Sequence, residues 1–345
     1  MIEMLSASLG VNANDPTFWM PLVFMGLLFL LIAGGVVLDG FDIGVGVLLP
    51  LAPVDERERM LQLLSPWRDA NEFWPLLGIG LLAAAFPQGW GVIFGKLYGP
   101  LTLMALGMML RSVSFEFRIR TRAELKSRWV LGFWLGSLAT ALGQGVALGR
   151  IATGYQTEAG YGWFTVVVGL CVVAAYVLLG ATWLFMRVDG DLQRRAARWG
   201  RHAIRWTAVG MVGTSVMLGL ANAGIFYKWS HPGGFVAVVA VWVVMLVCFS
   251  CVELMLARGA GGVSREGPCQ WAPFVLCIVL YWLMLAGLGY SLFPYLILDD
   301  ITLWDATASL ETMKLVLAAA VVGAPVVLIF NLWAYRAVFG KVRRG

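Results

Sequence analysis

The chain has 345 residues, of which 60% are hydrophobic and only 13% charged, and its mean hydropathy is +0.81. Soluble domains carry about 25% charged residues, so this composition excludes a soluble globular protein and indicates a membrane protein with many spans. Basic loops between the spans account for the formal net charge of +5, which therefore needs no nucleic-acid partner.

Apolar runs of 18 residues or more recur along the chain, and each is long enough to cross about 30 Å of hydrocarbon as a helix. The expected fold class is therefore all-α, a polytopic protein of about nine transmembrane helices that form a single integral-membrane domain. The expected spans are 18–50, 70–87, 92–115, 129–149, 162–186, 205–227, 235–257, 270–293 and 313–336.

We expect a short segment outside the membrane at each end of the given sequence. Residues 1–17 have no basic leader region, so we expect an outer N-terminal segment and a first span that is its own insertion signal. Residues 337–345 are expected to form a cytoplasmic tail. Most Lys and Arg residues fall in alternating loops and at the C-terminal end, so the positive-inside rule places the N-terminus outside and the C-terminus in the cytoplasm.

Two carboxylates interrupt the first span. The stretch LDGFDIGVG places Asp39 and Asp42 late in that span, where a charged side chain costs about 2.5–3.5 kcal/mol on insertion scales. Their spacing of three residues puts them side by side on a helix. Such residues usually face a bundle interior or an aqueous cavity.

A second charged group follows at the same expected end of the membrane. The stretch PWRDANEFW brings Arg68, Asp69 and Glu72 to the start of the second span. Four carboxylates beside one Arg cannot all stay ionised cheaply in a low dielectric, so we expect a coupled group that suits a proton path from the cytoplasm. The alternative is structural: Arg68 pairs with a carboxylate to fix helix packing, and Asp42 caps the Gly-rich bend.

Other cofactor and metal sites find little support in the residues. The two histidines, His202 and His231, lie outside the middle of any span, so paired haem ligation by His is excluded. Cys248 and Cys251 form a C-x-x-C without partner ligands and are interpreted as structural. We expect no metal site and no cofactor bound by this chain.

Several segments together resemble subunit II of cytochrome bd-type quinol oxidases, cyanide-insensitive oxidases included. DGFDIGVG is similar to the family's DGFD-(L/M)-G-x-G, and PWRDANEFW to its P-x-W-D-G-N-(E/Q)-x-W. Further matching segments, in family order, are AAAFP at 83–87, RSVSFEFR at 111–118, GATWLFMR at 180–187 and LWDATAS at 303–309. Two positions depart from the pattern: Arg68 stands where the family has Trp, and Ala70 where it has Gly.

The resemblance implies an architecture and an activity. It implies two four-helix bundles plus one peripheral helix, and a haem-free subunit packed against a subunit I that carries two haems b, one haem d and the quinol site. That complex oxidises quinol, reduces oxygen to water with protons from the cytoplasm, and lies in the bacterial inner membrane. The family's second subunit can also hold a structural quinone, and small single-span subunits can accompany the complex.

The candidate site combines the membrane acids with residues of the matched segments. The expected proton path consists of Asp39, Asp42, Asp69 and Glu72. The expected supporting residues are Arg68, Asn71, Trp74, Arg111, Glu116 and Asp305. Arg68 either pairs with Asp69 or fills the space that the tryptophan usually takes.

Two other functions remain open at this point. In the first, the chain is a stand-alone proton-coupled transporter whose path runs between the inner acids and an outer acidic loop that contains Asp305. In the second, the chain belongs to the oxidase but is only a scaffold, and every buried acid is structural. Co-purification with a haem-bearing partner would exclude the transporter, and proton-uptake kinetics would separate the scaffold from the proton path.

Overall fold

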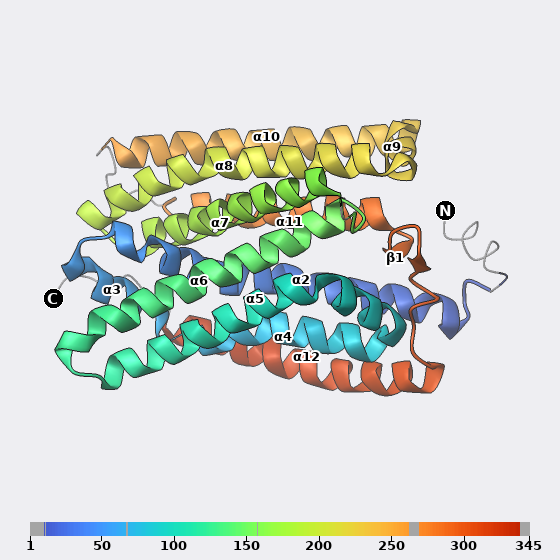
Figure 1. The fold of residues 1–345 in the computed structure, drawn as a ribbon, viewed down its shortest axis with the longest axis horizontal. Helices are drawn as coiled ribbons and strands as arrows, with labels where there is room; N and C mark the ends of the chain where they lie inside the picture. Colours follow the sequence, from blue (N-terminus) through green and yellow to red (C-terminus); the bar gives the residue numbers. More distant parts are fainter. Residues whose placement is uncertain (1–9, 11, 67, 157, 262–268, 339–345) are drawn as a thin grey trace.

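The computed structural model describes residues 10, 12–66, 68–156, 158–261 and 269–338 (Figure 1). The expected outer segment, 1–17, is therefore described only in part, and the expected tail, 337–345, lies almost wholly outside the described residues.

Long helices that run roughly along one axis make up most of the described chain (Figure 1). In chain order the elements are α2 (Pro16–Leu48), the 3-10 turn η1 (Leu49–Leu51), α3 (Val54–Leu64), α4 (Arg68–Ala85), α5 (Pro87–Arg120), α6 (Ala123–Ala152), α7 (Ala159–Arg187), α8 (Asp191–Ala221), α9 (Ala223–Ser230), α10 (Pro232–Ala260), α11 (Ala272–Leu292), β1 (Tyr295–Ile297), β2 (Ile301–Thr302) and α12 (Leu310–Val338).

Eight of the described helices are long and apolar enough to cross a membrane: α2, α5, α6, α7, α8, α10, α11 and α12. The remaining expected span, 70–87, is also a helix, α4, but its 18 residues include Arg68, Asp69 and Glu72. These charges lower its hydropathy, so α4 does not qualify by composition. The charges are held by neighbouring helices, as described below.

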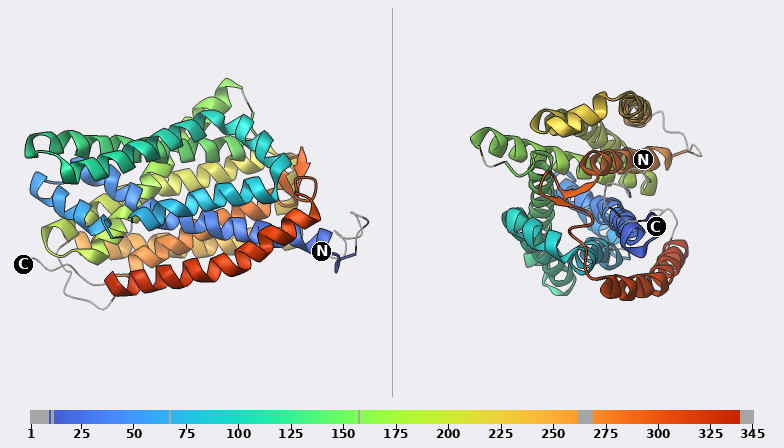
Figure 2. Two further views of the ribbon diagram at one scale, coloured as in Figure 1. Left: turned by 90° about the horizontal axis from the view of Figure 1, so that it is seen from below. Right: turned by 90° about the vertical axis from the view of Figure 1, so that its right-hand side faces the viewer.

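The helices group into two sets around α2 and α7. One set contains α2, α4, α5 and α6, and the other contains α7, α8, α10 and α11, with contacts of α7 to both α2 and α6 joining them. Helix α12 contacts α4 and α2 and lies at the rim of the end-on view (Figure 2). This arrangement matches the expected fold of two bundles and a peripheral helix.

Close backbone contact fixes α2 against α7. A Cβ atom on Gly44 would lie 1.8 Å from the backbone oxygen of Tyr176, and one on Gly180 would lie 2.5 Å from the carbonyl carbon of Gly44. Only glycine permits this approach, as in other membrane helix pairs with small residues at the contact. The contact holds the end of α2 that carries Asp39 and Asp42 deep inside the bundle.

Three features differ from the sequence-based expectation. The connection between the first two expected spans contains helix α3, whose buried Met60, Leu61 and Leu64 lie in a segment of low average hydropathy. Helix α8 begins at Asp191 rather than near 205, because its first turns are amphipathic. A two-stranded antiparallel hairpin, in which Tyr295 pairs with Thr302, interrupts the all-α pattern, since strands this short leave no periodic signal.

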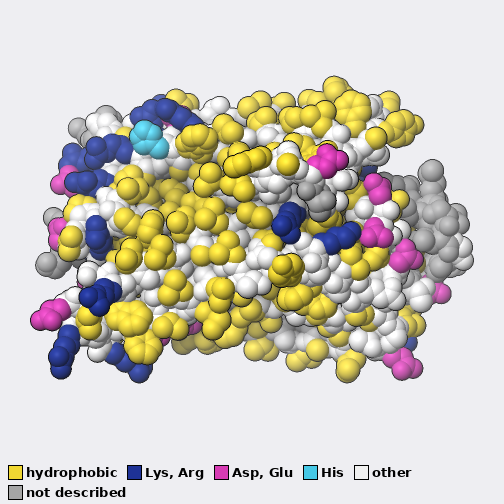
Figure 3. Space-filling model, in the orientation of Figure 1, with side chains coloured by type: hydrophobic (Ala, Val, Ile, Leu, Met, Phe, Trp, Pro, Cys, Tyr) yellow, Lys and Arg dark blue, Asp and Glu magenta, His cyan; other side chains and the backbone are white. Residues whose placement is uncertain are grey.

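Charge is distributed unevenly between the two ends. Hydrophobic side chains cover the middle of the face in Figure 3, and most of the visible Lys and Arg side chains lie toward the end that carries α3. We call this the basic end; it is where α3 lies, where α5 and α7 end, and where α6 and α8 begin. It is the end that the positive-inside rule predicts to face the cytoplasm.

Candidate functional site

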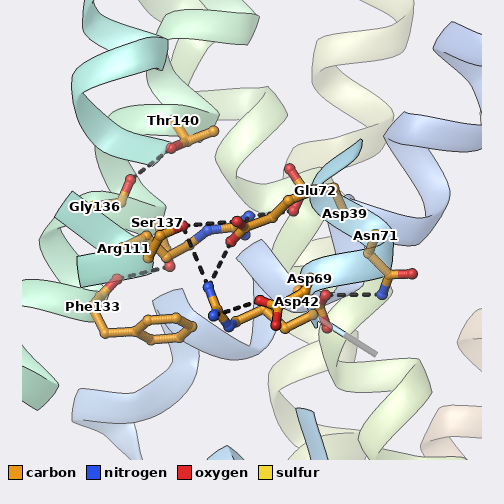
Figure 4. A network of polar contacts seen from close by, with 12 residues as sticks. Asp39, Asp42, Asp69, Asn71, Glu72, Arg111, Phe133, Gly136, Ser137 and Thr140 are labelled. Atoms are coloured by element: carbon orange, nitrogen blue, oxygen red, sulfur yellow. Dashed lines mark hydrogen bonds and ion pairs between the residues drawn. The ribbon is translucent and has the colours of Figure 1, made fainter. Parts of the chain in front are cut away.

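Two carboxyl groups are buried inside the bundle near the basic end. Asp39 and Asp42 are 1% and 0% exposed, and both lie on α2 with their side chains toward α4 and α5 (Figure 4). Asp42 precedes the last residue of α2, Leu48, by six positions, which corresponds to about 9 Å along the helix. The i, i+3 spacing predicted that they share a helix face, but each has a different partner.

Arg111 joins three helices at this point. Its side chain, on α5, is fully buried, and its Nη2 atom donates a hydrogen bond to Asp39 Oδ1 in a buried ion pair. The same Nη2 donates to Glu72 Oε1, on α4, at 3.0 Å. A charge-assisted hydrogen bond is stronger than a neutral one, so one guanidinium group ties α2 and α4 to α5.

Glu72 is the most highly connected carboxylate of the cluster. Its Oε1 accepts from Arg111 and, at 3.0 Å, from Arg68 Nη1. Its Oε2 accepts from Ser112 Oγ at 2.7 Å. Two cations and a hydroxyl group therefore hold this one carboxylate in place.

Asp42 has no cation as its direct partner. Its Oδ2 accepts from Asn71 Nδ2 at 2.9 Å, and its Oδ1 is buried with no hydrogen-bond partner among the described residues. Among the described residues, Asp39, Asp42 and Glu72 are three carboxylates around two cations, Arg68 and Arg111, so within this set of five side chains one negative charge is in excess. Protonation of one carboxyl removes that excess, and Asp42 is the best placed because its neighbour is a neutral amide.

Two further acids open the cluster to the surface. The Asp69 side chain is 76% exposed and lies 2.6 Å from Arg68 Nη2, and that of Glu116 is 50% exposed and lies 3.4 Å from the same atom. Glu72, three positions after Asp69 on α4, has a side chain that is only 16% exposed. The two acids therefore face different environments and are bridged by Arg68.

Two predicted supporting residues lie outside the polar network. Trp74 packs against α2, where a Cβ atom on Gly34 would lie 2.7 Å from its indole ring. The structure does not bring Asp305 to the cluster: it is exposed, near the hairpin at the opposite end, and accepts from the Thr302 hydroxyl at 2.5 Å and the Thr302 backbone N–H at 3.3 Å. This contact closes a local turn.

Sequence reasoning missed four residues in and beside the cluster. Ser112 and Phe115 belong to the segment RSVSFEFR, which therefore held the signal, since they follow Arg111 on the same helix. Tyr176 on α7 packs over Gly40 beside Asp39 and donates to Gln144 Oε1. Neither Tyr176 nor Gln144 lies in a charged segment, so no local pattern pointed to them.

The described residues contain no group of three or more His, Cys, Asp and Glu side chains arranged to hold a metal ion. His202 is exposed on α8, and His231 precedes α10.

The chain is similar to known proteins over nearly its whole length. The sequence model of the family described as cytochrome bd terminal oxidase subunit II matches residues 20–338. Cytochrome bd-I ubiquinol oxidase subunit 2 of Escherichia coli (strain K12) is 27% identical over 359 residues, which cover 92% of this chain and 94% of that protein. Cytochrome bd ubiquinol oxidase subunit 2 of Bacillus subtilis (strain 168) is 25% identical over 328 residues, or 90% of this chain and 93% of that protein.

A solved structure has the same fold. The chain is similar to a chain in the structure of bd oxidase from Geobacillus thermodenitrificans, with a TM-score of 0.74 and 17% sequence identity. The match covers 93% of this chain and 99% of the other.

Proposed function

The chain belongs to the cytochrome bd terminal oxidase subunit II family, and on that premise we propose that it conducts protons from the cytoplasm to a haem-bearing partner subunit. Membership makes it a multi-pass membrane subunit of a quinol:oxygen oxidoreductase of a respiratory chain, and it implies a partner subunit I. Because the similar proteins are bacterial, we place it in the bacterial inner membrane. The proton path and the haem-free character are the proposal itself.

The positions of the two histidines support a haem-free subunit. His202 lies in the part of α8 near the basic end, whereas His231 follows α9 at the opposite end. The 19 helical residues between His202 and the end of α8, Ala221, correspond to about 28 Å. The two imidazoles therefore cannot ligate one haem from both sides. Two haems b and one haem d would be held by the partner.

The acid cluster supports a proton path. Each electron that reduces oxygen to water requires one proton. In the proposed route a proton arrives at Asp69 or Glu116, moves to Glu72, and then reaches Asp42, and each carboxyl that releases it becomes a carboxylate again. The observation that carries the proposal is a set of three carboxylates around two arginines, in which Asp39 and Asp42 are buried and Glu72 is linked through Arg68 to exposed acids.

The test is Asp42→Asn in the assembled oxidase. Asparagine has nearly the same shape and can still accept from Asn71, so the fold and haem content should be preserved while the exchangeable proton is lost. We expect oxygen uptake to fall at least roughly tenfold, since a positioned acid–base group contributes on the order of 100-fold or more. Asp69→Asn should have a smaller effect, because Glu116 offers a second entry point.

Glu253→Gln is the matched control. Glu253 also lies on a membrane helix, but it pairs with Arg201 away from the cluster, so turnover should stay at the wild-type level. Proton uptake after a single turnover, followed with a pH-sensitive dye, separates conduction from a scaffold role. Wild-type turnover in both Asp42→Asn and Asp69→Asn would exclude the proton path.

A further inference from the structure

Arg68 is the residue where the buried acids and the exposed acids meet. Its Nη1 atom faces inward, 3.0 Å from Glu72 Oε1 and 3.3 Å from Ser112 Oγ. Its Nη2 atom faces outward, 2.6 Å from Asp69 Oδ1 and 3.4 Å from Glu116 Oε1. Its side chain is only 4% exposed, so the guanidinium lies between the two sets of acids.

The position of Arg68 is unfavourable on local grounds. It is the first residue of α4, and the positive end of the helix dipole disfavours a cation there. The guanidinium group is kept in place by carboxylates on both sides and by the Phe115 ring, whose centroid is 4.4 Å from Arg68 Cζ. Surrounding groups therefore determine its place, rather than the preference of the helix.

The charge of Arg68 determines how many protons the buried acids need. With Arg68 and Arg111 present, Asp39, Asp42 and Glu72 carry one excess negative charge, whereas without Arg68 they would carry two. Arginine stays protonated in proteins, so Arg68 can neither take up nor release the proton that passes. It acts only through its field and its hydrogen bonds.

We propose that Arg68 is a positioning residue that limits the group of Asp39, Asp42 and Glu72 to one exchangeable proton, because its charge compensates one of these carboxylates through Glu72 on one side while it holds the exposed acids in line on the other. This inference rests on the proposed proton path. The groups that face Arg68 or its direct partners are Asp39 and Asp42 on α2, Asp69 and Glu72 on α4, Arg111, Glu116 and Arg118 on α5, and Tyr176 on α7 beside Asp39.

The test compares Arg68→Gln with Arg118→Gln in the assembled oxidase. Arg118 is a matched control because it lies over the same Phe115 ring, 5.2 Å from its centroid, but pairs with Glu58 instead of the cluster. For Arg68→Gln we expect the alkaline fall of the oxygen-uptake rate to move about one to three pH units upward, as for loss of a neighbouring opposite charge. Arg118→Gln should keep the wild-type profile, and Arg68→Lys should restore most of it.

Infrared difference spectroscopy at neutral pH counts protonated carboxyl groups independently of turnover. We expect one in the wild type and a second in Arg68→Gln, which adding Glu72→Gln removes. A wild-type pH profile and an unchanged carboxyl count in Arg68→Gln would overturn the proposal, even if Asp42→Asn slows turnover. Normal turnover of both Asp42→Asn and Asp69→Asn, in contrast, would overturn the proton path, and the carboxyl count would then test Arg68 by itself.

If Arg68→Gln does not assemble, Glu116→Gln tests the same inference, with an expected pH shift in the opposite direction. Its side chain is half exposed, so its replacement should be tolerated. Removing this outer partner leaves more of the Arg68 charge for Glu72, and the alkaline limb should move to lower pH. An unchanged or upward-shifted limb would contradict the inference.

Discussion

The buried ion pair between Arg111 and Asp39 makes a quantitative prediction about stability. Both side chains are at most 1% exposed, so replacing Arg111 by Gln leaves the Asp39 carboxylate without its cation. Breaking a buried pair by removing one partner typically costs about 3–5 kcal/mol. Because Arg111 also holds Glu72, at 3.0 Å, we expect Arg111→Gln to reach the upper part of that range.

The reverse change should cost less. In Asp39→Asn the guanidinium of Arg111 keeps Glu72 as an anionic partner, so we expect a loss of about 1–3 kcal/mol, near that of an unsatisfied buried group. In the double variant the uncompensated carboxylate is absent. The double variant should therefore be more stable than the sum of the two single changes implies. We expect a coupling free energy of about 2 kcal/mol between the two sites, within the usual range for residues in contact.

The assay is reversible unfolding of the purified protein in mixed micelles of increasing denaturing-detergent content, followed by circular dichroism. Arg111→Gln combined with Glu253→Gln is the reference pair, because Glu253 contacts Arg201 and not this cluster; those two changes should be additive. Additivity of Arg111→Gln and Asp39→Asn, within about 0.5 kcal/mol, would refute the claim that they form a buried pair.

Two further predictions concern other contacts. The hydrogen bond and charge of Arg118 hold the pKa of Glu58 on α3 below its usual value, although burial acts in the opposite direction. The stability that this adds is present at neutral pH and is lost as the pH falls below about 4, and it is small because the carboxylate is half exposed. The difference in melting temperature between wild type and Glu58→Gln should therefore vanish on acidification, and a constant difference from pH 6 to pH 3 would count against this prediction. Gly44→Ala should push α2 away from the Tyr176 carbonyl and destabilise the chain by about 1–3 kcal/mol. Gly26→Ala is the control on the same helix: no atom lies within 4 Å of a new Cβ, so it should be close to neutral in the same detergent titration. Equal effects of the two changes would show that α2 and α7 do not touch at Gly44.

The sequence predicts the long helices well because a membrane span depends mainly on local hydropathy and length. Its weak points are the short elements, α3 and the β1–β2 hairpin, where tertiary contacts rather than average hydropathy decide the structure. Helix α4 is intermediate: its position was predicted, but which residues of α5 its charges contact depends on how the two helices pack.

The members of the candidate site were easier to predict than their pairing. Acids inside an apolar span are easily recognised in a sequence, and the segment 111–118 supplied the cation, Arg111. The i, i+3 spacing could not tell that Asp39 would meet Arg111 while Asp42 would meet Asn71, because this depends on how α4 and α5 are rotated against α2. Asp305 was included from its segment alone, and its local turn with Thr302 explains its position without the cluster.

The long sequence separation within the Asp39–Arg111 pair has a consequence for biogenesis. The two residues are 72 positions apart, so α2 leaves the ribosome and enters the translocon well before α5 has been synthesised. Its apolar stretch, with a mean hydropathy of 2.6, offsets the roughly 2.5–3.5 kcal/mol that each acid costs on entry. Until α5 arrives, Asp39 has no Arg111 beside it, so the buried ion pair can form only as a late event of subunit maturation.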